Sequence, residues 1–276
     1  MPTIERLRRL TLLLAWLALG LPASAVAAEA PAGEFTDTEC VACHVGQDAG
    51  LLATQRDGPH AAVGCSACHG ATHGRLPRAR DDATCSGCHA GAAAASHANS
   101  KHGVLLTLAP PDWNAPLQRG RYRAPGCAYC HLHDGDHGNR MDPARGREQA
   151  VWVCGGCHAP RFATTQLEAG ARLVAVAELK RREAAAIAGC LPTGDETRAA
   201  LLARVDGHLR NVRLGAGHQS PDYQWWYGQP ALDGDLIRLR DRVEHWRRGI
   251  GAEPGPDAAT DAMVVRPGPD RACDPR

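Results

Sequence analysis

Cys40-Val-Ala-Cys-His44 is the first of five pentads of the form Cys-x-x-Cys-His in this 276-residue sequence. Residues at positions i, i+3 and i+4 share one face of a helical turn. Two thiols on such a face can bond to the vinyl groups of one porphyrin while the adjacent histidine reaches its iron. The pentad is the attachment signature of a c-type haem. Five copies therefore predict five covalently bound haem c groups.

The residues that this interpretation assigns fall into two sets. The expected attachment cysteines are Cys40, Cys43, Cys65, Cys68, Cys85, Cys88, Cys127, Cys130, Cys154 and Cys157. The expected proximal iron ligands are His44, His69, His89, His131 and His158. Zinc sites and disulfide scaffolds also use paired cysteines. Neither requires a histidine directly after the second cysteine in all five pentads.

The N-terminus has the order of a secretory signal peptide. Arg6, Arg8 and Arg9 precede an apolar run over 10–21, and small residues follow at 23–28. This order is typical of an exported protein, and the run is shorter than the about 20 residues of a membrane-spanning helix. Thioether attachment of haem occurs in the same exported compartment in bacteria. We therefore expect cleavage within 25–28 and a periplasmic location.

The composition gives information on binding partners, on the protein interior and on the domain organisation. The net charge of +1 gives no electrostatic reason to expect binding to nucleic acid or to an anionic membrane. Two Phe and four Tyr provide little apolar bulk, so we expect the haems to supply much of the interior. We predict a signal peptide over 1–28, a pentahaem cytochrome c domain over 29–160, a helical region over 161–250 and a flexible tail over 251–276.

The expected fold is mainly α with extensive irregular structure: a haem-stack domain followed by a bundle of C-terminal helices. We predict a helix over 166–188, closed by Gly189, and a second helix opened by a capping box from Thr193 to Glu196. The apolar stripe of the second helix consists of Leu201, Val205, Leu209 and Val212. A third helix, over about 235–248, directs Leu236, Leu239, Val243 and Trp246 inward.

Nine histidines outside the pentads are available as second axial ligands. After processing only two methionines remain, so bis-histidine coordination and low reduction potentials are expected for most haems. His60 and His73 are candidates in turn-like contexts. His97 and His133 each lie near a stronger candidate. His208 shares a helix face with Val205 and Val212 and is expected to be structural, and His245 is expected at the surface.

Several stretches resemble one family, the multihaem cytochromes related to hydroxylamine oxidoreductase and to cytochrome c554. Cys40–His44 with Gly58-Pro-His60 and Cys65–His73 resembles the opening haem pair of that family. Ser100-Lys-His-Gly103 and Gly126–His137 resemble its later haems, where isolated histidines act as distal ligands. Cys154–Phe162 resembles its last haem, and Gly217–Gly228 resembles a C-terminal element that returns a histidine to the haem stack. The resemblance implies that His102, His137 and His218 are distal ligands.

The sequence also departs from this family. Family enzymes typically carry eight haems, and their catalytic haem has an open distal face and a tyrosine cross-link that none of the four tyrosines here can be matched to. Pentahaem nitrite reductases use a Cys-x-x-Cys-Lys pentad at the active haem, and this chain has none. The family's oligomerisation through long C-terminal helices implies a homo-oligomer. Outside the pentads, Cys190 and Cys273 are expected to form a disulfide in an oxidising compartment.

Two functions follow from these observations. The first is an electron carrier that passes electrons from a quinol-linked or enzymatic donor to a periplasmic acceptor through mostly bis-histidine haems. The second is an enzyme resembling hydroxylamine oxidoreductase, with one five-coordinate haem that binds a small nitrogen or sulfur compound. In the second case His133, Asp134 and Asp136 would transfer protons. No catalytic residue can be assigned from the sequence.

Overall fold

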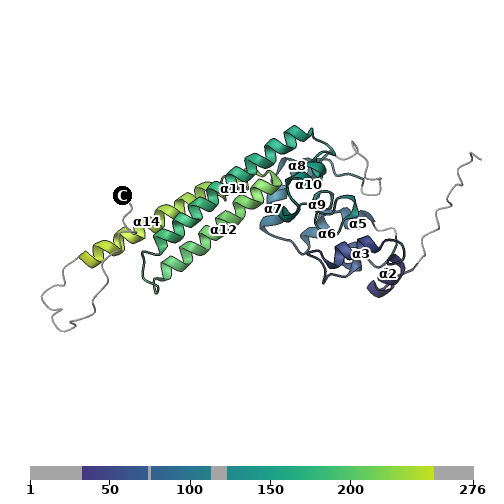
Figure 1. Cartoon of the computed structure of the whole chain (residues 1–276), viewed down its shortest axis with the longest axis horizontal. Helices are drawn as coiled ribbons and strands as arrows, with labels where there is room; N and C mark the ends of the chain where they lie inside the picture. Colours follow the sequence, from purple (N-terminus) through teal and green to yellow (C-terminus); the bar gives the residue numbers. More distant parts are fainter. Residues whose placement is uncertain (1–32, 74–75, 113–122, 252–276) are drawn as a thin grey trace, which may run out of the picture.

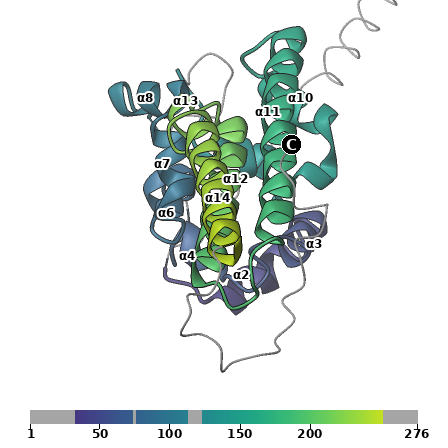
Figure 2. The same cartoon turned by 90° about the vertical axis from the view of Figure 1, so that its left-hand side faces the viewer.

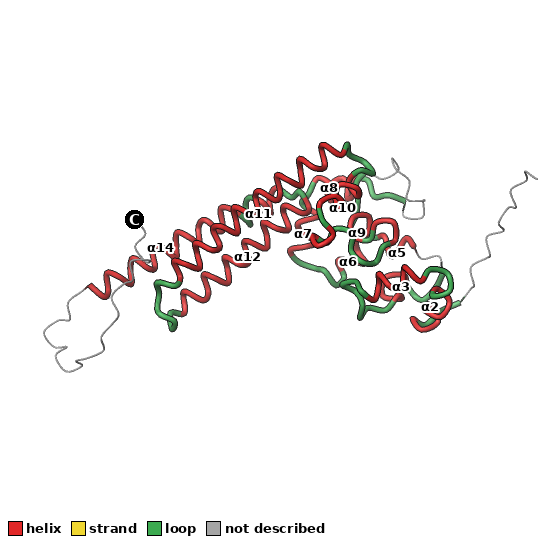
Figure 3. The backbone as a smooth tube through the Cα atoms, in the orientation of Figure 1, coloured by secondary structure: helices red, strands yellow, loops and turns green. Residues whose placement is uncertain are grey.

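The computed structural model describes residues 33–73, 76–112 and 123–251. This part of the chain consists of helices and irregular segments, with one isolated β-bridge between Glu34 and Thr72 (Figure 3). The expected mainly α fold is confirmed. Across the described ranges, no helix is both long and apolar enough to cross a membrane. The expected signal peptide, and the expected tail beyond residue 251, lie outside the described residues.

Short helices occupy the first part of the described chain. They are α2 (Asp37–His44), α3 (Ala49–Arg56), α4 (Cys65–His69), α5 (Leu76–Arg80), α6 (Asp82–Ser86), α7 (Ala92–Ala98), α8 (Lys101–Leu108), α9 (Cys127–His131) and α10 (Arg147–Cys154), with two 3₁₀ turns, η1 (His133–Gly135) and η2 (Pro143–Arg145). Figure 1 shows them gathered at one end of an elongated molecule. Only four apolar side chains are buried in this described region: Leu52, Leu106, Ala124 and Val153. It therefore has almost no apolar core of its own.

Three long helices form the other end of the molecule. They are α11 (Pro160–Ala188), α12 (Glu196–His218) and α14 (Gln229–Gly251), with the short α13 (Pro221–Gln224) between the last two. The long helices pack side by side as a bundle (Figures 1 and 2). On α11 the buried residues Ala163, Gly170, Ala177 and Ala184 recur every seven positions, so one narrow stripe of small side chains faces its neighbours. A Cβ atom at Gly170 would lie 3.3 Å from Ala216, which shows how closely α12 approaches.

The apolar stripes predicted for the bundle are confirmed, but the helix starts differ from the predictions. Leu201, Val205, Leu209 and Val212 of α12 are buried, as are Leu236, Leu239 and Val243 of α14, while Trp246 is half-buried. Helix α11 begins at Pro160, six residues before the predicted start, and α14 begins six residues early at Gln229. Proline is compatible with a first helical turn, so Pro160 and Pro230 extend these helices rather than delaying them.

The capping box predicted for α12 is wrong. Asp195, not Thr193, is the N-cap, and its carboxylate accepts a hydrogen bond from Arg198 N at 3.0 Å. The same carboxylate binds the guanidinium of Arg242 on α14 at 2.8 Å. Arg242 holds the pKa of Asp195 below its ordinary value. Asp195 therefore caps α12 and also links it to α14 through Arg242. The predicted cap, Thr193, is not the residue that caps this helix.

A buried carboxylate joins α12 to α14 in the middle of the bundle. Asp235 is fully buried, and its two oxygens bind Arg204, Arg238 at 2.7 Å and His208 Nε2 at 3.0 Å. The other ring nitrogen of His208 lies 3.3 Å from the Tyr227 carbonyl oxygen. His208 is therefore a structural residue of the bundle, as its position on the apolar face of α12 predicts.

Replacing Asp235 with alanine is expected to lower the free energy of unfolding by about 2 kcal/mol, because the hydrogen bonds of the buried carboxylate to three donors are lost. Chemical denaturation followed by far-ultraviolet circular dichroism measures this loss. The control is Glu178→Ala, which removes an exposed ion pair with Arg213 at 3.0 Å and is expected to cost less than about 1 kcal/mol. Equal losses in the two variants would contradict a special role for the buried carboxylate.

Candidate haem sites

Each pentad adopts the helical turn that haem attachment requires. Three pentads lie entirely within α2, α4 and α9. The third and fifth begin at the last turns of α6 and α10 and continue as one further turn. There His89 N donates to Cys85 O and His158 N donates to Cys154 O, both at 2.9 Å. In all five pentads the two cysteines and the histidine therefore share one face.

Every pentad histidine faces a second histidine from elsewhere in the chain. The pairs and their ring-centroid distances are His44 with His73 (6.3 Å), His69 with His137 (6.2 Å), His89 with His60 (5.8 Å), His131 with His218 (6.4 Å) and His158 with His102 (6.1 Å). The partners come from α8, from the end of α12 and from loops that follow α3, α4 and η1. The structure thus brings together each expected proximal ligand with one of the five leading distal candidates.

The spacing of these pairs fits an iron ion between the rings. An imidazole nitrogen lies about 2 Å from a bound metal ion, so two rings on opposite sides of one ion have centroids about 6 Å apart. The five observed distances lie between 5.8 and 6.4 Å. His60 Nε2 and His89 Nε2 are 3.5 Å apart, close to the about 4 Å that a shared ion needs. The residues present therefore fit five bis-histidine haems.

The second ring nitrogen of several paired histidines is bound to the protein. His131 Nδ1 lies 3.0 Å from Asn139 Oδ1, and His137 Nδ1 lies 2.8 Å from the Gly135 carbonyl oxygen. Both partners are acceptors, so the Nδ1 atoms carry the protons and the Nε2 lone pairs are free. Partners of this kind fix the orientation of a metal-binding imidazole.

His218 reaches its pair from the C-terminal end of α12. Its Nδ1 lies 2.5 Å from Ser96 Oγ, and Ser96 donates its own hydroxyl proton to the Ala93 carbonyl oxygen at 2.9 Å. Nδ1 is therefore the donor, which leaves the Nε2 lone pair free. Burial, and then the neighbouring His97 and His131, lower the pKa of His218 to about 4. The ring is neutral at pH 7, the form that binds a metal.

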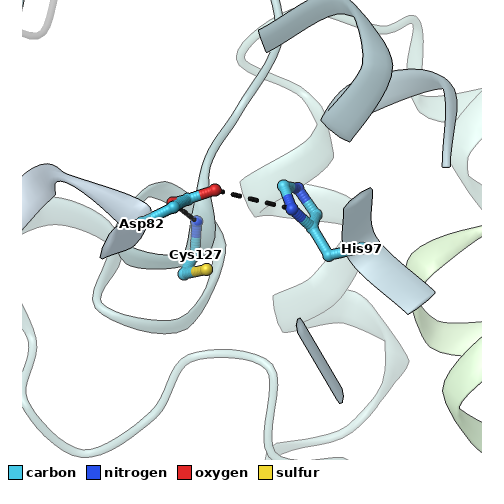
Figure 4. Close-up of side chains that lie close together, drawn as sticks. All are labelled: Asp82, His97 and Cys127. Carbon is cyan, nitrogen blue, oxygen red and sulfur yellow. Dashed lines mark hydrogen bonds and ion pairs between the residues drawn. The ribbon is translucent and has the colours of Figure 1, made fainter. Parts of the chain in front are cut away.

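His97 also lies near His218, with a centroid distance of 5.9 Å, but both of its ring nitrogens face protein acceptors. Nδ1 is 3.5 Å from Asp82 Oδ2 and Nε2 is 3.2 Å from the Pro125 carbonyl oxygen. Figure 4 shows that Asp82 contacts both His97 and Cys127. The ligand atoms of these three residues all lie within 4.8 Å of one another. Because Cys127 belongs to the fourth pentad, its sulfur is assigned to a haem and not to a separate metal ion.

The remaining histidines do not face a pentad histidine. His133 Nδ1 donates to the Tyr129 carbonyl oxygen at 2.8 Å, and its ring lies edge-on to Trp152 at 5.0 Å. Its Nε2 is 3.8 Å from Asp134, while Asp136 instead binds Arg140 and Arg145. His245 is exposed, as expected. The three groups considered for proton transfer are thus held in structural contacts.

Two glycines allow the distal histidines to approach their partners. A Cβ atom at Gly103 would lie 2.1 Å from the His97 carbonyl oxygen, so α8 can start against α7 only with glycine next to His102. A Cβ atom at Gly58 would lie 2.6 Å from the His137 carbonyl oxygen. Both glycines lie in stretches that carry the family resemblance, but the sequence does not reveal these roles or those of Ser96 and Asn139. No local pattern marks the last two, because their partners are 122 and 8 residues away.

Successive pentads are spatial neighbours. Thiols of consecutive pentads lie near enough to shift each other's pKa in four pairs: Cys40 with Cys65, Cys68 with Cys85, Cys85 with Cys127, and Cys130 with Cys154. Helix α2 also contacts α4, and α6 contacts α9. The five sites therefore follow one another in space in the order of the sequence.

Cys190, two residues after the end of α11, is disulfide-bonded. Its expected partner, Cys273, lies outside the described residues, so the pairing itself stays a prediction. None of the ten pentad cysteines forms a disulfide. They are therefore available for thioether bonds.

Comparison with known proteins agrees with these sites. Residues 24–142, which contain the first four pentads, match the family described as "Seven times multi-haem cytochrome CxxCH". Among similar solved structures is a "Hypothetical multiheme protein", with a TM-score of 0.56 and 16% identity over 68% of this chain and 59% of that one. Another is the "reducing HAO-like protein complex Kustc0457/Kustc0458" of Kuenenia stuttgartiensis, with a TM-score of 0.54 and 19% identity over 70% of this chain and 61% of that one.

These comparisons show two features that the chain shares with known proteins, a fold and a haem attachment motif. The chain spans about three fifths of the length of both solved structures. The structural likeness shows a shared fold, and the Cys-x-x-Cys-His family match implies covalently bound c-type haem. The chain therefore shares the fold of these multihaem proteins and carries the attachment motif of c-type haem.

Proposed function

We propose that this chain is a pentahaem electron-transfer protein in which every iron lies between two imidazoles. The proposed proximal and distal ligands are His44 and His73 for the first haem, His69 and His137 for the second, His89 and His60 for the third, His131 and His218 for the fourth, and His158 and His102 for the fifth. The observation that carries the proposal is that all five pentad histidines face a second histidine at 5.8–6.4 Å.

The order of the sites supports a linear route for electrons. When bound, each haem supplies a one-electron couple, and two histidine ligands keep its potential lower than a histidine–methionine pair would. The chain's own residues hold neighbouring pentads next to each other from the first to the fifth. Electrons would therefore enter near one end of this series and leave near the other.

The location and partners form part of the same proposal. The signal-like N-terminus supports export to the periplasm, where a quinol-linked or enzymatic donor and a periplasmic acceptor would meet the haems. The homo-oligomer is carried over from the family resemblance. An enzyme acting on a small nitrogen or sulfur compound would need a haem with an open distal face. The five histidine pairs support the carrier instead.

The electron paramagnetic resonance spectrum of the oxidised holoprotein tests the proposal. We expect five haems by mass, all low-spin, with no change on adding cyanide. Three ring pairs are inclined by 34–39° and two by 65–75°. Nearly perpendicular rings leave two iron d orbitals close in energy, so we expect two low-spin signals with larger g anisotropy than the other three. One high-spin, cyanide-sensitive haem would contradict the carrier and favour the enzyme.

A further inference from the structure

Two of the pentad helices begin without a cap of their own. Helix α4 starts at Cys65 directly after Gly64, and α9 starts at Cys127 directly after Gly126. Neither glycine provides a side chain for the free N–H groups of the first turn. Such groups need an acceptor from elsewhere when the helix end is covered.

The missing caps come from the preceding pentad helices. Asp37 of α2 accepts a hydrogen bond from Ser66 N, and Asp82 of α6 accepts one from Cys127 N, both through Oδ1 at 2.7 Å (Figure 4 shows the second). Each aspartate stands three residues before the first cysteine of its own pentad, Cys40 or Cys85. One pentad helix therefore caps the next pentad helix in both cases.

The glycines are the matching half of this contact. A Cβ atom at Gly64 would lie 1.9 Å from Asp37 Oδ2, and one at Gly126 would lie 2.5 Å from Asp82 Oδ1. Any larger residue would force the carboxylate away. The sequence thus repeats one unit, Asp-x-x-Cys-x-x-Cys-His followed by Gly-Cys-x-x-Cys-His, over residues 37–69 and again over 82–131.

The fifth pentad lies outside this repeat. Val153, which is buried, precedes Cys154, and Cys154 ends α10 instead of starting a helix. Its first cysteine is thus held by its own helix. Carboxylate capping between helices is confined, within the described residues, to the second and fourth pentads.

We propose that Asp37 and Asp82 are positioning residues that lock the first four haems into two pairs, the first with the second and the third with the fourth. This inference rests on the proposed haem ligation and adds to it. Each aspartate fixes the relative placement of two haem-attachment turns and leaves a negative charge between them. The charge stabilises the oxidised irons and lowers the potentials of the pair.

The test compares variants of the full holoprotein. Asp37→Ala and Asp82→Ala are expected to alter the Soret circular dichroism couplet, which reports the relative orientation of neighbouring haems. Asp37→Asn and Asp82→Asn keep an acceptor oxygen, so the couplet is expected to persist while at least one midpoint potential rises. Gly64→Ala and Gly126→Ala keep the charge but separate the helices, so the couplet is expected to change.

The controls remove a charge from the same helices without touching the contact. Glu39→Gln changes the local cap of α2 with Thr36, and Asp81→Asn changes the cap at Ala83 N, while both leave the hydrogen bonds between the pentad helices in place. The proposal would be overturned if the Asp→Ala and Gly→Ala variants gave the same Soret circular dichroism couplet as these controls. If a variant loses haem, peptide mapping decides: loss at the second or fourth pentad supports the capping role, and loss elsewhere overturns it. Mass and spin state of the unsubstituted protein test the haem ligation separately.

Discussion

The chain produced without haem attachment is expected to lose the short helices from α2 to α10 and to keep its helical bundle. In that first region only Leu52, Leu106, Ala124 and Val153 are buried apolar side chains among the described residues. A fully buried large apolar side chain contributes about 2 kcal/mol, whereas ordering each residue costs about 1–2 kcal/mol of chain entropy. Four side chains cannot offset that cost for over a hundred residues, so the haems must supply the interior.

The bundle differs because it has its own core. Two buried clusters join its helices: Ala184, Ala188, Leu201, Val205, Leu236 and Leu239 form one, and Ala177, Leu209, Val212 and Leu232 form the other. Limited proteolysis of the haem-free chain is therefore expected to remove the region before Pro160 and to leave a fragment that contains α11, α12 and α14. The holoprotein under the same conditions is the control. Equal protection of both regions in the haem-free chain would contradict a haem-dependent interior.

The sequence predicts the attachment sites and the bundle core because both follow from local spacing. Cys-x-x-Cys-His needs only one helical turn, and the stripe from Leu201 to Val212 needs only the helical period. The five leading distal histidines are also the five that the structure pairs with pentad histidines. His97 and His133, which each lie near a stronger candidate in the sequence, contact backbone carbonyl oxygens in the structure.

The pairing of those histidines could not be predicted, because sequence proximity does not determine it. His60 stands five residues before the second pentad but faces His89 of the third, and His137 follows the fourth pentad but faces His69 of the second. These choices depend on how the loops cross one another, for example where Gly58 lies against the backbone of His137. The aspartate caps were missed for a related reason: a helix cap is normally sought in the residue before the helix, and here it comes from another helix.

Replacing His218 with alanine is expected to convert one haem in five from low-spin to high-spin. His218 is the one distal candidate that the bundle provides; its Nδ1 is bound to Ser96, and its ring centroid lies 6.4 Å from that of His131. Without it the fourth iron loses its sixth ligand and gains an open face. Its midpoint potential is expected to rise by on the order of 100 mV, a fraction of the about 0.8 V range that axial ligands span. Quantitative electron paramagnetic resonance and redox titration measure both changes.

His97→Ala is the matched control. The ring centroid of His97 lies 5.9 Å from that of His218, but both nitrogens of His97 contact other protein groups, Asp82 and the Pro125 carbonyl oxygen. This variant is expected to keep five low-spin haems. High-spin iron in His97→Ala, with none in His218→Ala, would show that His97 is the sixth ligand and that His218 has the structural role. Added imidazole is expected to restore the low-spin spectrum of His218→Ala, because it can occupy the space of the lost ring. The His218→Ala variant would also have the open haem face that an enzyme of the hydroxylamine oxidoreductase type requires. If hydroxylamine reduces this variant and not the unsubstituted protein, His218 keeps the fourth haem from reacting with small molecules.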